Sequence, residues 1–575
     1  MLEPLWVLPD LDEAAIAPLA SELKLCRPAA RVLWNRGYRD AAAARRFLDP
    51  SIDDLHDPKL LPGLDTAVER LLRAVRQQEK ILLYGDYDVD GASSVVILKK
   101  AIELAGGTAR HFVPHRLRDG YGMRSEVLRC AAAEGVKLVI SVDTGIRAAA
   151  VVREAATLGL DVVITDHHLP DSELPPALAI LNPNLPGCTY PDKDLCGAGV
   201  AFKLVQALLE RLDWPGDKRR RMIDSFLKMV AIATIADVVP LTGENRVIVK
   251  RGLAALRNVR SPGLRALLEV SGLAEGDSPS SGQVAFRIAP RMNAAGRMAS
   301  AEEVIELLLT EDEDRARALA AQLHALNGER QQTEAGIVRR VLEECVQTPV
   351  SDDYAALVFS GEGWHRGVVG IVASRLVERF HRPVFVLGEA SGQAQGSGRG
   401  IRNFHLLEAL ESMSQLFLRF GGHKQAAGVT LACEHIAEFR ERLNCYAGAR
   451  LTKSDFRETI EVDARLSLDE ATDDAVLEIL TLAPFGSANP APLFFVQGAE
   501  LYGPAQVLKD EHRIVRLRQN NRTVRVKAWN FASHLESFAP GDQVDVILRF
   551  EDDPYSAGRG YAPWCATLKG IRRTQ

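Results

Sequence analysis

Short apolar segments alternate with amphipathic stretches in the part of the chain that begins near residue 76. The apolar runs cover residues 81–84, 111–113, 138–142, 162–165 and 178–181. Between them, residues 92–105, 125–134 and 147–158 place apolar positions at helical spacing. Apolar runs that alternate with helices are typical of βαβ units, so this pattern predicts a parallel sheet.

The rest of the chain shows three other patterns. Short helices are predicted before residue 76, at residues 12–25, 40–47 and 67–78. Residues 197–345 are mostly helical in pattern, with helices expected at 302–309, 315–326 and 333–345, and we interpret this part as a long helical connector rather than a separate enzyme core. A second α/β segment begins at Tyr354 with strands at 355–359 and 383–387. From about residue 456 the pattern predicts strands at 493–496, 514–518, 523–529 and 544–550.

These patterns predict five parts. They are a helical lead-in (1–75), an α/β domain with a parallel sheet (76–240), a helical part with a connector helix (241–345), a second α/β domain (346–450) and a β domain (451–575). About 150 residues per domain would give about four domains for 575 residues. The repeated turns and short strands of the last part favour an OB-like barrel.

Composition narrows the class of protein. The chain is 47% hydrophobic, which excludes a mainly disordered protein. With 70 Lys+Arg against 76 Asp+Glu, the net charge is −6, so any basic surface must be local. The 8 cysteines form no C-x-x-C pair, which argues against a zinc ribbon or a disulfide scaffold. With no signal-peptide pattern and no apolar span of membrane length, we expect a cytoplasmic protein with no membrane contact.

Acidic residues and histidines follow several of the predicted strands. Asp86, Asp88 and Asp90 come directly after the first strand, and Asp143 ends another. Asp166, His167 and His168 end a third strand, and Asp237 stands alone in an apolar stretch. The D-x-D-x-D-G pattern also begins an EF-hand loop, but the twelfth position is Ile97, where that loop needs Glu. An acidic surface turn, or helix-capping carboxylates, would be the structural alternatives.

The positions of these side chains favour metal binding. Ligands of open α/β sheets bind beyond the carboxyl ends of the strands, where these residues are expected to meet. Carboxylates gathered there would repel one another without cations. Carboxylate oxygens mixed with imidazole suit Mn²⁺ or Mg²⁺. Two such ions could activate a water and stabilise the leaving oxygen of a phosphoryl transfer, so metal-dependent phosphoester hydrolysis is the hypothesis.

Five motifs resemble those of a known family. Residues 85–91 (GDYDVDG) and 166–168 (DHH) resemble the DHH phosphoesterase superfamily. Residues 291–297 (RMNAAGR), 363–371 (GWHRGVVGI) and 421–428 (GGHKQAAG) resemble its RecJ family of bacterial single-strand exonucleases. The resemblance implies a DHH domain, a DHHA1-like substrate-binding domain and an OB-like single-strand-binding domain. It also implies a 5′-to-3′ exonuclease that releases 5′-mononucleotides from single-stranded DNA in recombination and repair.

The resemblance further implies roles for individual residues. It implies metal ligands at Asp86, Asp88, Asp143, His167 and Asp237. It places His168 beside the scissile phosphate or against a metal ligand, where it could protonate the leaving oxygen. Asp90 and Asp166 would each orient a ligand or form a turn. One departure is Tyr84, where some relatives carry a histidine that helps to hold the first ion.

Arginines and glycine-rich turns are candidates for binding the strand end. Arg116 and Arg118 follow a predicted strand, in a loop that contributes to a 5′-phosphate pocket in the family. Ser397 and Arg399 lie in GSGRG, a turn whose backbone N–H groups suit an anion. Further candidates in the motifs are His423, Arg291 and Arg297. The alternative for any single arginine is a solvated charge or a structural ion pair.

The C-terminal part contains a local basic face. Alternation along the predicted strand 523–529 puts Arg525, Lys527 and Trp529 on one side. Arg516 and Arg518 alternate in the same way on the preceding strand. Cations with an aromatic ring suit single-stranded nucleic acid, whereas the alternative is the ordinary solvated face of a half-buried sheet.

Two other functions remain open at this point. One is a phosphoesterase for small substrates such as short oligonucleotides or cyclic dinucleotides, whose members of the superfamily are shorter and lack the basic β domain. The other is a non-catalytic replication or scaffold protein, in which the ligand positions would have eroded. In this chain every proposed ligand position is occupied. At family level the expected partners are single-stranded DNA, a single-strand-binding protein and a helicase.

Overall fold

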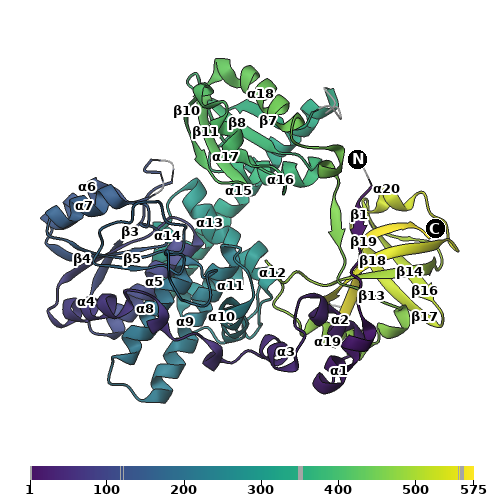
Figure 1. The fold of residues 1–575 in the computed structure, drawn as a ribbon, viewed down its shortest axis with the longest axis horizontal. Coiled ribbons are helices and arrows are strands. Elements are labelled where there is room, and N and C mark those ends of the chain that lie inside the picture. The colour runs from purple at the N-terminus through teal and green to yellow at the C-terminus, as the bar shows by residue number, and fades with distance from the viewer. Residues whose placement is uncertain are drawn as a thin grey trace.

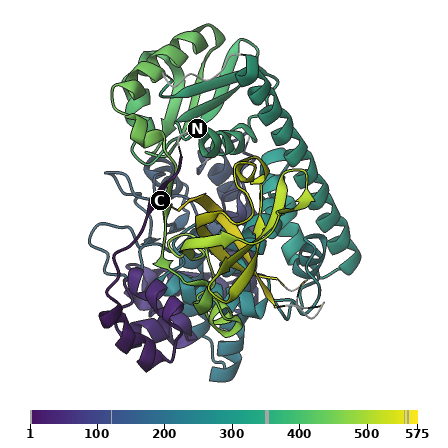
Figure 2. The same ribbon diagram turned by 90° about the vertical axis from the view of Figure 1, so that its right-hand side faces the viewer.

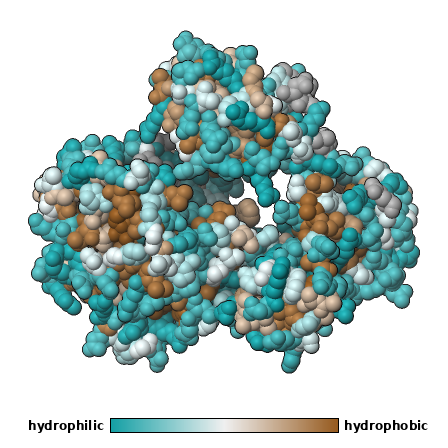
Figure 3. All heavy atoms as spheres, in the orientation of Figure 1, coloured by the Kyte–Doolittle hydropathy of each residue, from teal (hydrophilic) through white to brown (hydrophobic). Residues whose placement is uncertain are grey.

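Three parts of the chain surround a central opening (Figures 1 and 3). The computed structural model describes residues 3–116, 118–120, 122–347, 354–553, 556, 558 and 562–574. Leu117 and Tyr121, which belong to the arginine-containing loop at 113–122, lie outside the described residues. Among those that are described, no helix is both long and apolar enough to cross a membrane.

The first part contains the predicted parallel sheet. Its five strands have the order β3-β2-β4-β5-β6, and every neighbouring pair is parallel. The strands are β2 (Lys80–Tyr84), β3 (Ala109–Phe112), β4 (Val136–Val142), β5 (Asp161–Thr165) and β6 (Ala179–Leu181). The chain leaves β2 for β3 on one side and returns to β4 on the other, so the strand order reverses between β2 and β4. Open parallel sheets bind ligands at such a reversal.

Helices cover both faces of this sheet because its strands are apolar on both sides. One face packs against α4 (Leu64–Arg76), α5 (Val89–Leu104) and α8 (Gly197–Glu210). The other packs against α6 (Ser125–Ala133) and α7 (Ala149–Thr157). The expected helices therefore form, with ends within a few residues of the predicted ones.

The helical segment after the sheet extends the same hydrophobic core. Its helices are α9 (Gly216–Ala236), α10 (Gly243–Ala255), α11 (Pro262–Val270), α12 (Ser281–Gln283), the π-helical turn η3 (Val284–Ile288), α13 (Ala289–Met298) and α14 (Glu302–Leu309). Their apolar side chains join one buried cluster with those of the first sheet, which continues to Leu323. Most of the segment that we expected to be a connector is therefore part of the first core.

A single long helix forms the actual connection. Helix α15 (Glu313–Gln347) has 35 residues and runs from the first part to the second sheet (Figure 2). The sequence predicted two helices here, because polar residues interrupt the apolar spacing. In the structure Asn327, Arg330 and Glu334 are buried, and Arg330 donates hydrogen bonds to both of the others, so the polar stretch is satisfied inside a continuous helix.

The second sheet is mixed, with the order β10-β11-β9-β8-β7. Its strands are β7 (Leu357–Glu362), β8 (Val384–Ala390), β9 (Gln393–Arg399), β10 (Phe417–Gly422) and β11 (Ala426–Ala432). The end of α15 and α16 (Val369–Phe380) pack on one face. The other face packs against α17 (Leu406–Glu411) and α18 (Ile436–Gly448).

The C-terminal part is a β-barrel, as the sequence predicted. Its principal strands are β14 (Leu493–Leu501), β16 (His512–Gln519), β17 (Arg522–Ala528), β18 (Gln543–Asp552) and β19 (Trp564–Arg573). They pair in the order β14-β18-β19-β17-β16, and a further pairing of β14 with β16 closes the ring. Short strands β13 (Ala464–Arg465) and β15 (Gln506–Lys509) extend it at the edges.

The N-terminal helices belong to this barrel and not to the sheet that follows them in sequence. Helices α1 (Glu13–Leu23), α2 (Arg27–Asn35) and α3 (Ala41–Leu48) share a buried cluster with α19 (Asp473–Leu480) and the barrel strands. The strand β1 (Leu5–Val7) pairs in parallel with β12 (Thr459–Glu461). The sequence predicted α1 and α3 but not α2, and it contained no indication of the partner on which they pack.

Candidate active site

The loops that follow β2 and β4 meet where the strand order of the first sheet reverses. Asp88 is the N-cap of α5, where its carboxylate accepts the backbone N–H groups of Asp90 and Gly91. Asp86 lies just before this turn and is buried. Gly91 is required here, since a Cβ on it would lie 2.5 Å from the Asp86 carbonyl oxygen. The turn thus holds two carboxylates at the carboxyl end of β2.

Asp143 occupies a constrained position at the end of β4. Its φ of 59° lies in the left-handed region, which Asp and Asn tolerate better than most residues. The N-terminus of α8 packs directly against its side chain, because a Cβ on Gly197 would lie 2.6 Å from the Cβ of Asp143. This close approach fixes the carboxylate between β4 and α8.

Asp90 binds the N-terminus of α8 with both of its carboxylate oxygens. They accept the backbone N–H groups of Gly197 at 2.6 Å and Ala198 at 2.7 Å. A carboxylate is favoured there by the exposed N–H groups and the helix dipole. Asp90 was expected either to orient a ligand or to form a turn, and this geometry favours the first. Its bonds join the motif after β2 to helix α8, which packs on Asp143.

Asp166 organises the two histidines that follow it. It accepts the N–H groups of Ile146, His167 and His168, and it bonds the ring Nδ1 of His168 at 2.7 Å. Burial alone would raise the pKa of Asp166, but the bonds from His168 and the backbone hold that pKa below its ordinary value. Burial opposes the charged form of His168, yet the bond to Asp166 raises the pKa of this imidazole. The Nε2 atom of His168 is thereby the ring nitrogen turned away from Asp166.

His167 lies at the centre of the carboxylate cluster. Its Nε2 atom is 3.2 Å from Asp143 Oδ1, 3.7 Å from Asp237 Oδ2 and 3.8 Å from Asp90 Oδ2. Burial comes first among the influences on its pKa and lowers it, which favours the neutral ring that binds metals. The structure thus brings side chains from three strands and from the end of α9 to one point.

The donor set fits divalent cations. Ligand atoms in three groups lie within 4.8 Å of one another: Asp86 with Asp88 and Asp143, Asp90 with His167 and Asp237, and Asp143 with His167 and His168. The Oδ1 atoms of Asp86 and Asp143 are buried and have no hydrogen-bond partner among the described residues. Buried polar atoms normally have partners, so these oxygens are available to bind a cation.

The charge of the cluster supports the same interpretation. Burial, and next the neighbouring carboxylates, raise the pKa of Asp86 to about 8 and that of Asp237 to about 8. The same causes raise the pKa of Asp143 well above its ordinary value. His168 and, for Asp86, Arg116 offset these influences only in part. Without a further positive charge the side chains would have to take up protons, so the cluster suits a bound cation.

This arrangement predicts that stability without metal falls as the pH rises. With a pKa of about 8 in the folded chain and about 4 in the unfolded chain, each of Asp86 and Asp237 binds a proton more strongly when folded. The contribution of each carboxyl to the free energy of unfolding is fully present below about pH 4. It is lost as the pH rises to about 8, by at most about 1.4 kcal/mol per pH unit. Calorimetry in chelator should show a lower Tm at pH 8 than at pH 6, and Mn²⁺ should restore it at pH 8.

The control is Asp86→Asn, which removes one titrating carboxylate and keeps the side-chain volume. We expect its metal-free Tm at pH 8 to exceed that of the unchanged chain, and its response to Mn²⁺ to be smaller. The same Tm at both pH values in chelator, with no increase on adding Mn²⁺, would contradict the prediction.

A second cluster, of arginines, lies beside the carboxylates. The pKa of Arg297 is lowered to about 10, first by burial and then by the charges of Arg116, Arg330 and Arg399. The guanidinium of Arg116 lies 4.9 Å from the centre of the Tyr87 ring. Where the structure describes the chain, no carboxylate comes within 4.0 Å of Arg116, Arg297 or Arg399. Arginines that repel one another and form no direct ion pair with a carboxylate suit an anion.

The structure separates the other sequence-predicted anion binders. Ser397 and Gly370 lie against Arg399: a Cβ on Gly370 would be 3.1 Å from Arg399 Nη2 and 3.4 Å from Ser397 Oγ. Arg291 instead donates to the ring of His324 and to the carbonyl of Arg287. Arg118 is exposed.

His423 stands across from the metal cluster, at the edge of the second sheet. It shares a pocket of about 470 Å³ with His168, Thr144 and Arg147. Burial, followed by the charges of Arg147 and His168, lowers the pKa of His423 and favours its neutral form. The pocket is therefore bordered by both α/β parts of the chain.

Sequence reasoning missed two residues of this region. Tyr87 stands inside the carboxylate motif and supports Arg116, which its position in the motif could have suggested. Arg330 lies in the middle of α15, bonded to Glu334 at 2.6 Å and to Asn327 at 2.9 Å. Nothing in the local sequence distinguishes it from a solvated helix arginine. Tyr84 is buried below the metal cluster and donates its hydroxyl to the Gly122 carbonyl at 3.2 Å.

The basic face of the barrel is less basic than the sequence indicated. Arg525 is exposed and lies directly opposite Arg516 in the ladder between β16 and β17. Lys527 is paired with Asp553 at 2.8 Å, and Arg518 is paired with Glu500 at 2.7 Å. Strand β17 ends at Ala528, and Trp529, one residue beyond it, contacts His512 edge-on. The register between β16 and β17 would place this pair next in line after Lys527, on the same face.

Comparison with known protein families gives matches over three segments. The N-terminal domain of the DHH family matches residues 80–234, the DHHA1 domain matches residues 352–449, and the RecJ OB domain matches residues 462–559.

Curated proteins match over most of the chain. The single-stranded-DNA-specific exonuclease RecJ of Bacillus subtilis is 38% identical over 94% of this chain and 68% of its own length. That of Dickeya dadantii is 41% identical over 81% of this chain and 82% of its own length.

Solved structures match as well. RecJ from Thermus thermophilus in complex with Mn²⁺ aligns with a TM-score of 0.83 and 33% identity, and the alignment covers 100% of this chain and 80% of that one. An exonuclease RecJ bound to manganese aligns with a TM-score of 0.60 and 39% identity, over 68% of this chain and 96% of that one.

Proposed function

We propose that this chain, which belongs to the RecJ family of single-stranded-DNA-specific exonucleases, hydrolyses single-stranded DNA with Mn²⁺ or Mg²⁺. We further propose that it works from a 5′ end, releases 5′-mononucleotides and serves DNA recombination and repair. One observation supports this most. Carboxylates with unsatisfied buried oxygens lie beside arginines that form no ion pair within 4.0 Å with a described carboxylate.

The proposed ligands are Asp86, Asp88, Asp143, His167 and Asp237, and Asp143 belongs to two of the three groups. Two divalent cations held by these side chains would supply an activated water and positive charge opposite the phosphate that is attacked. The protein contributes rigidity to this site. The left-handed backbone at Asp143, and the closeness of Gly197 to it, prevent the carboxylate from moving away.

His168 is the proposed acid. Its Nδ1 atom is held by Asp166, and the raised pKa keeps more of the ring protonated near neutral pH. Its Nε2 atom would give a proton to the 3′ oxygen that leaves as the phosphorus–oxygen bond breaks. That oxygen belongs to the released nucleotide, whereas the water oxygen stays on the phosphate of the remaining strand. Each cycle therefore leaves a new 5′-phosphate.

The arginine cluster is the proposed receptor for that 5′-phosphate. Arg116, Arg297 and Arg399 converge from three separate elements, together with the hydroxyl of Ser397. A terminal phosphate carries more charge than an internal phosphodiester and so binds better to several guanidinium groups. Binding one end this way, one nucleotide from the metals, would impose the 5′-to-3′ direction.

The test is a digestion of end-labelled single strands. We expect mononucleotides to be released from the 5′ end with Mn²⁺ or Mg²⁺, and no release with chelator or on blunt duplex. Release from the 3′ end would overturn the proposed polarity, and activity in chelator would overturn the metal assignment. Hydrolysis restricted to dinucleotides would favour the small-substrate phosphoesterase, against which the barrel with its exposed Arg525 argues.

The barrel is the proposed site for the strand beyond the reacting end. Arg525 and Arg516 face each other across two strands and form no ion pair with a described carboxylate, whereas Asp553 neutralises Lys527. We therefore predict that Arg525→Gln weakens strand binding more than Lys527→Gln. Removing one cation that binds a phosphate should reduce the slope of log affinity against log salt by about 0.7. A salt titration checks this, and an equal slope in both variants and the unchanged chain would contradict it.

We also propose a cytoplasmic location and transient partners. A helicase would supply unwound strands, and a single-strand-binding protein would present them. The test compares the rate of digestion of a duplex with a single-stranded end, with and without each of these proteins. We expect either protein to increase the rate. No change in rate with both present would contradict it.

A further inference from the structure

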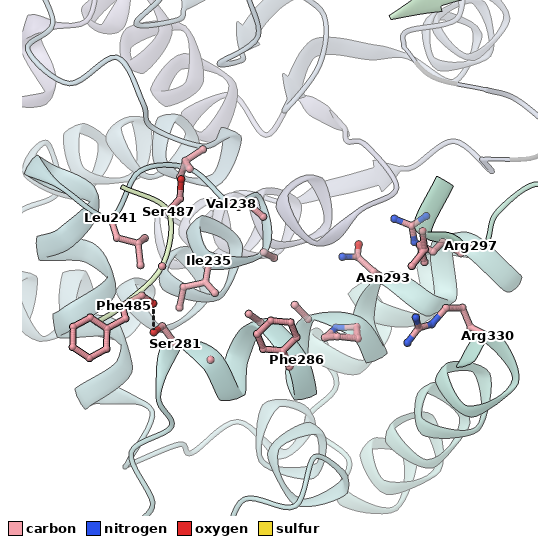
Figure 4. Close-up of a pocket in the computed structure, with 18 residues that line it drawn as sticks. Ile235, Val238, Leu241, Ser281, Phe286, Asn293, Arg297, Arg330, Phe485 and Ser487 are labelled. Atoms are coloured by element: carbon pink, nitrogen blue, oxygen red, sulfur yellow. Dashed lines mark hydrogen bonds between the residues drawn. The ribbon is translucent and has the colours of Figure 1, made fainter. Parts of the chain in front are cut away.

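A groove of about 420 Å³ leads away from the two clusters, toward the barrel (Figure 4). Its walls come from the end of α9, from α12 to α13, and from the loop that contains Phe485 and Ser487. Hydrogen bonds fix this junction: Ser281 Oγ donates to the Phe485 carbonyl at 2.6 Å, and the Leu241 N–H donates to the Ser487 carbonyl at 2.9 Å. The groove is thus a built feature between the first core and the barrel.

The chemistry of the groove changes along its length. Arg297, Arg330 and Asn293 lie at one end, next to the anion site (Figure 4). Arg297 forms no ion pair within the described part of the chain, whereas Arg330 is paired with Glu334. The middle is apolar, with Ala285, Phe286, Ala289 and Pro290. Cations at one end and apolar surface in the middle suit a strand that carries both phosphates and bases.

Phe286 is unusually exposed for a phenylalanine. Its exposed fraction is 82%, although both neighbouring helical turns contribute buried residues to the core. It stands in the π-helical turn η3 (Val284–Ile288), between α12 and α13. The wider turn is a rare feature that is often found at functional sites. Here it turns an aromatic ring into the groove while Val284 and Ile288 stay buried.

A second exposed side chain in the groove has a strained backbone. Val238 has a φ of 61°, which is rare for a β-branched residue, and an exposed fraction of 68%. It directly follows Asp237, one of the proposed metal ligands. Strain of this kind persists where the surrounding structure requires it, and it clusters at functional sites. Val238 lines the groove and is the residue next to Asp237, so the apolar part of the groove adjoins the metal cluster.

We propose that this groove guides the single strand, and that Phe286 stacks on one of its bases. The inference rests on the proposed nuclease function and names the residue that positions the strand next to the reacting phosphate. An aromatic face binds any base, so such a contact suits an enzyme that must accept every sequence. Arg297, at the end of the groove beside the anion site, provides the matching contact to a phosphate.

The test is a double-mutant cycle between protein and DNA. Affinity is measured in chelator, so that nothing is hydrolysed, for a short 5′-phosphorylated oligonucleotide with one abasic residue at successive positions. We expect Phe286→Ala to weaken binding of the intact strand about 5- to 150-fold. When the abasic residue stands at the stacked position, the affinity of the unchanged chain should fall by a similar factor. The affinity of Phe286→Ala should hardly change. Phe286→Tyr should restore the affinity.

Controls separate this inference from the function on which it rests. Val346→Ala removes an equally exposed apolar side chain, 80% exposed at the end of α15, and should bind the strand as the unchanged chain does. If Phe286→Ala and the unchanged chain have the same affinity at every abasic position, the groove holds another ligand. That result would overturn this inference but not the proposed function. A chain that neither binds nor degrades single strands would overturn the proposed function as well.

Discussion

Replacing Asp143 with asparagine should lower the rate of strand hydrolysis by about 10³-fold or more. The carboxylate belongs to two of the three possible ligand groups, and its buried Oδ1 has no hydrogen-bond partner among the described residues. Asparagine keeps the volume and tolerates the left-handed backbone at φ 59°. Only the charge and one oxygen are removed, and metal catalysis of phosphate chemistry contributes several kcal/mol of transition-state stabilisation.

The measurement is single-turnover hydrolysis of a 5′-labelled strand, accompanied by a binding titration. The variant should bind the strand within about threefold of the unchanged chain, because the arginine cluster is intact. Asp213→Asn is the matched control, since Asp213 is exposed and lies in a turn after α8. A hydrolysis rate for Asp143→Asn within tenfold of normal would remove Asp143 from the ligand set.

Replacing Arg399 with methionine should remove the preference for a 5′-phosphate. We expect kcat/KM for a phosphorylated end to fall about 100-fold, since truncating one partner of a buried charge pair costs about 2–5 kcal/mol. For a 5′-hydroxyl end the fall should be less than about threefold. The variant should remain folded, because it loses a charge whose neighbour Arg116 repels it.

The check compares the two ends in one digestion, with Arg379→Met as the control. Arg379 is exposed on α16 and lies outside the arginine cluster. An equal loss of activity on both kinds of end would show that Arg399 holds the strand without recognising its terminal phosphate. No loss of activity on either would place the phosphate elsewhere.

The cluster of carboxylates could be predicted because it depends on short-range pattern. Apolar runs indicated the strands, and Asp143 and Asp166 each follow one directly, whereas Asp86 follows one after a single glycine. In a parallel sheet these positions share one edge, so their proximity follows from the fold class. Asp237 has no such support, since it comes from the end of α9, and its role as a ligand entered only through the family resemblance.

Contacts between distant segments could not be predicted in this way. The partner of Lys527 is Asp553, on the loop after β18, and no periodicity connects the two. The buried set of Asn327, Arg330 and Glu334 looked like a break in a helix, although these residues satisfy one another inside it. The exposure of Phe286 depends on a π-helical turn that apolar spacing does not reveal.

The packing of α1–α3 on the barrel determines the order in which the molecule can be completed. During synthesis these helices emerge first, but their partners, from Ala464 onward, follow more than 400 residues later. Until then Leu19, Val32 and Phe47 have no apolar surface to cover them, a state prone to aggregation. A chain cut after the second α/β part would keep that defect permanently. A shortened version should therefore omit both ends together, since they form one folding unit.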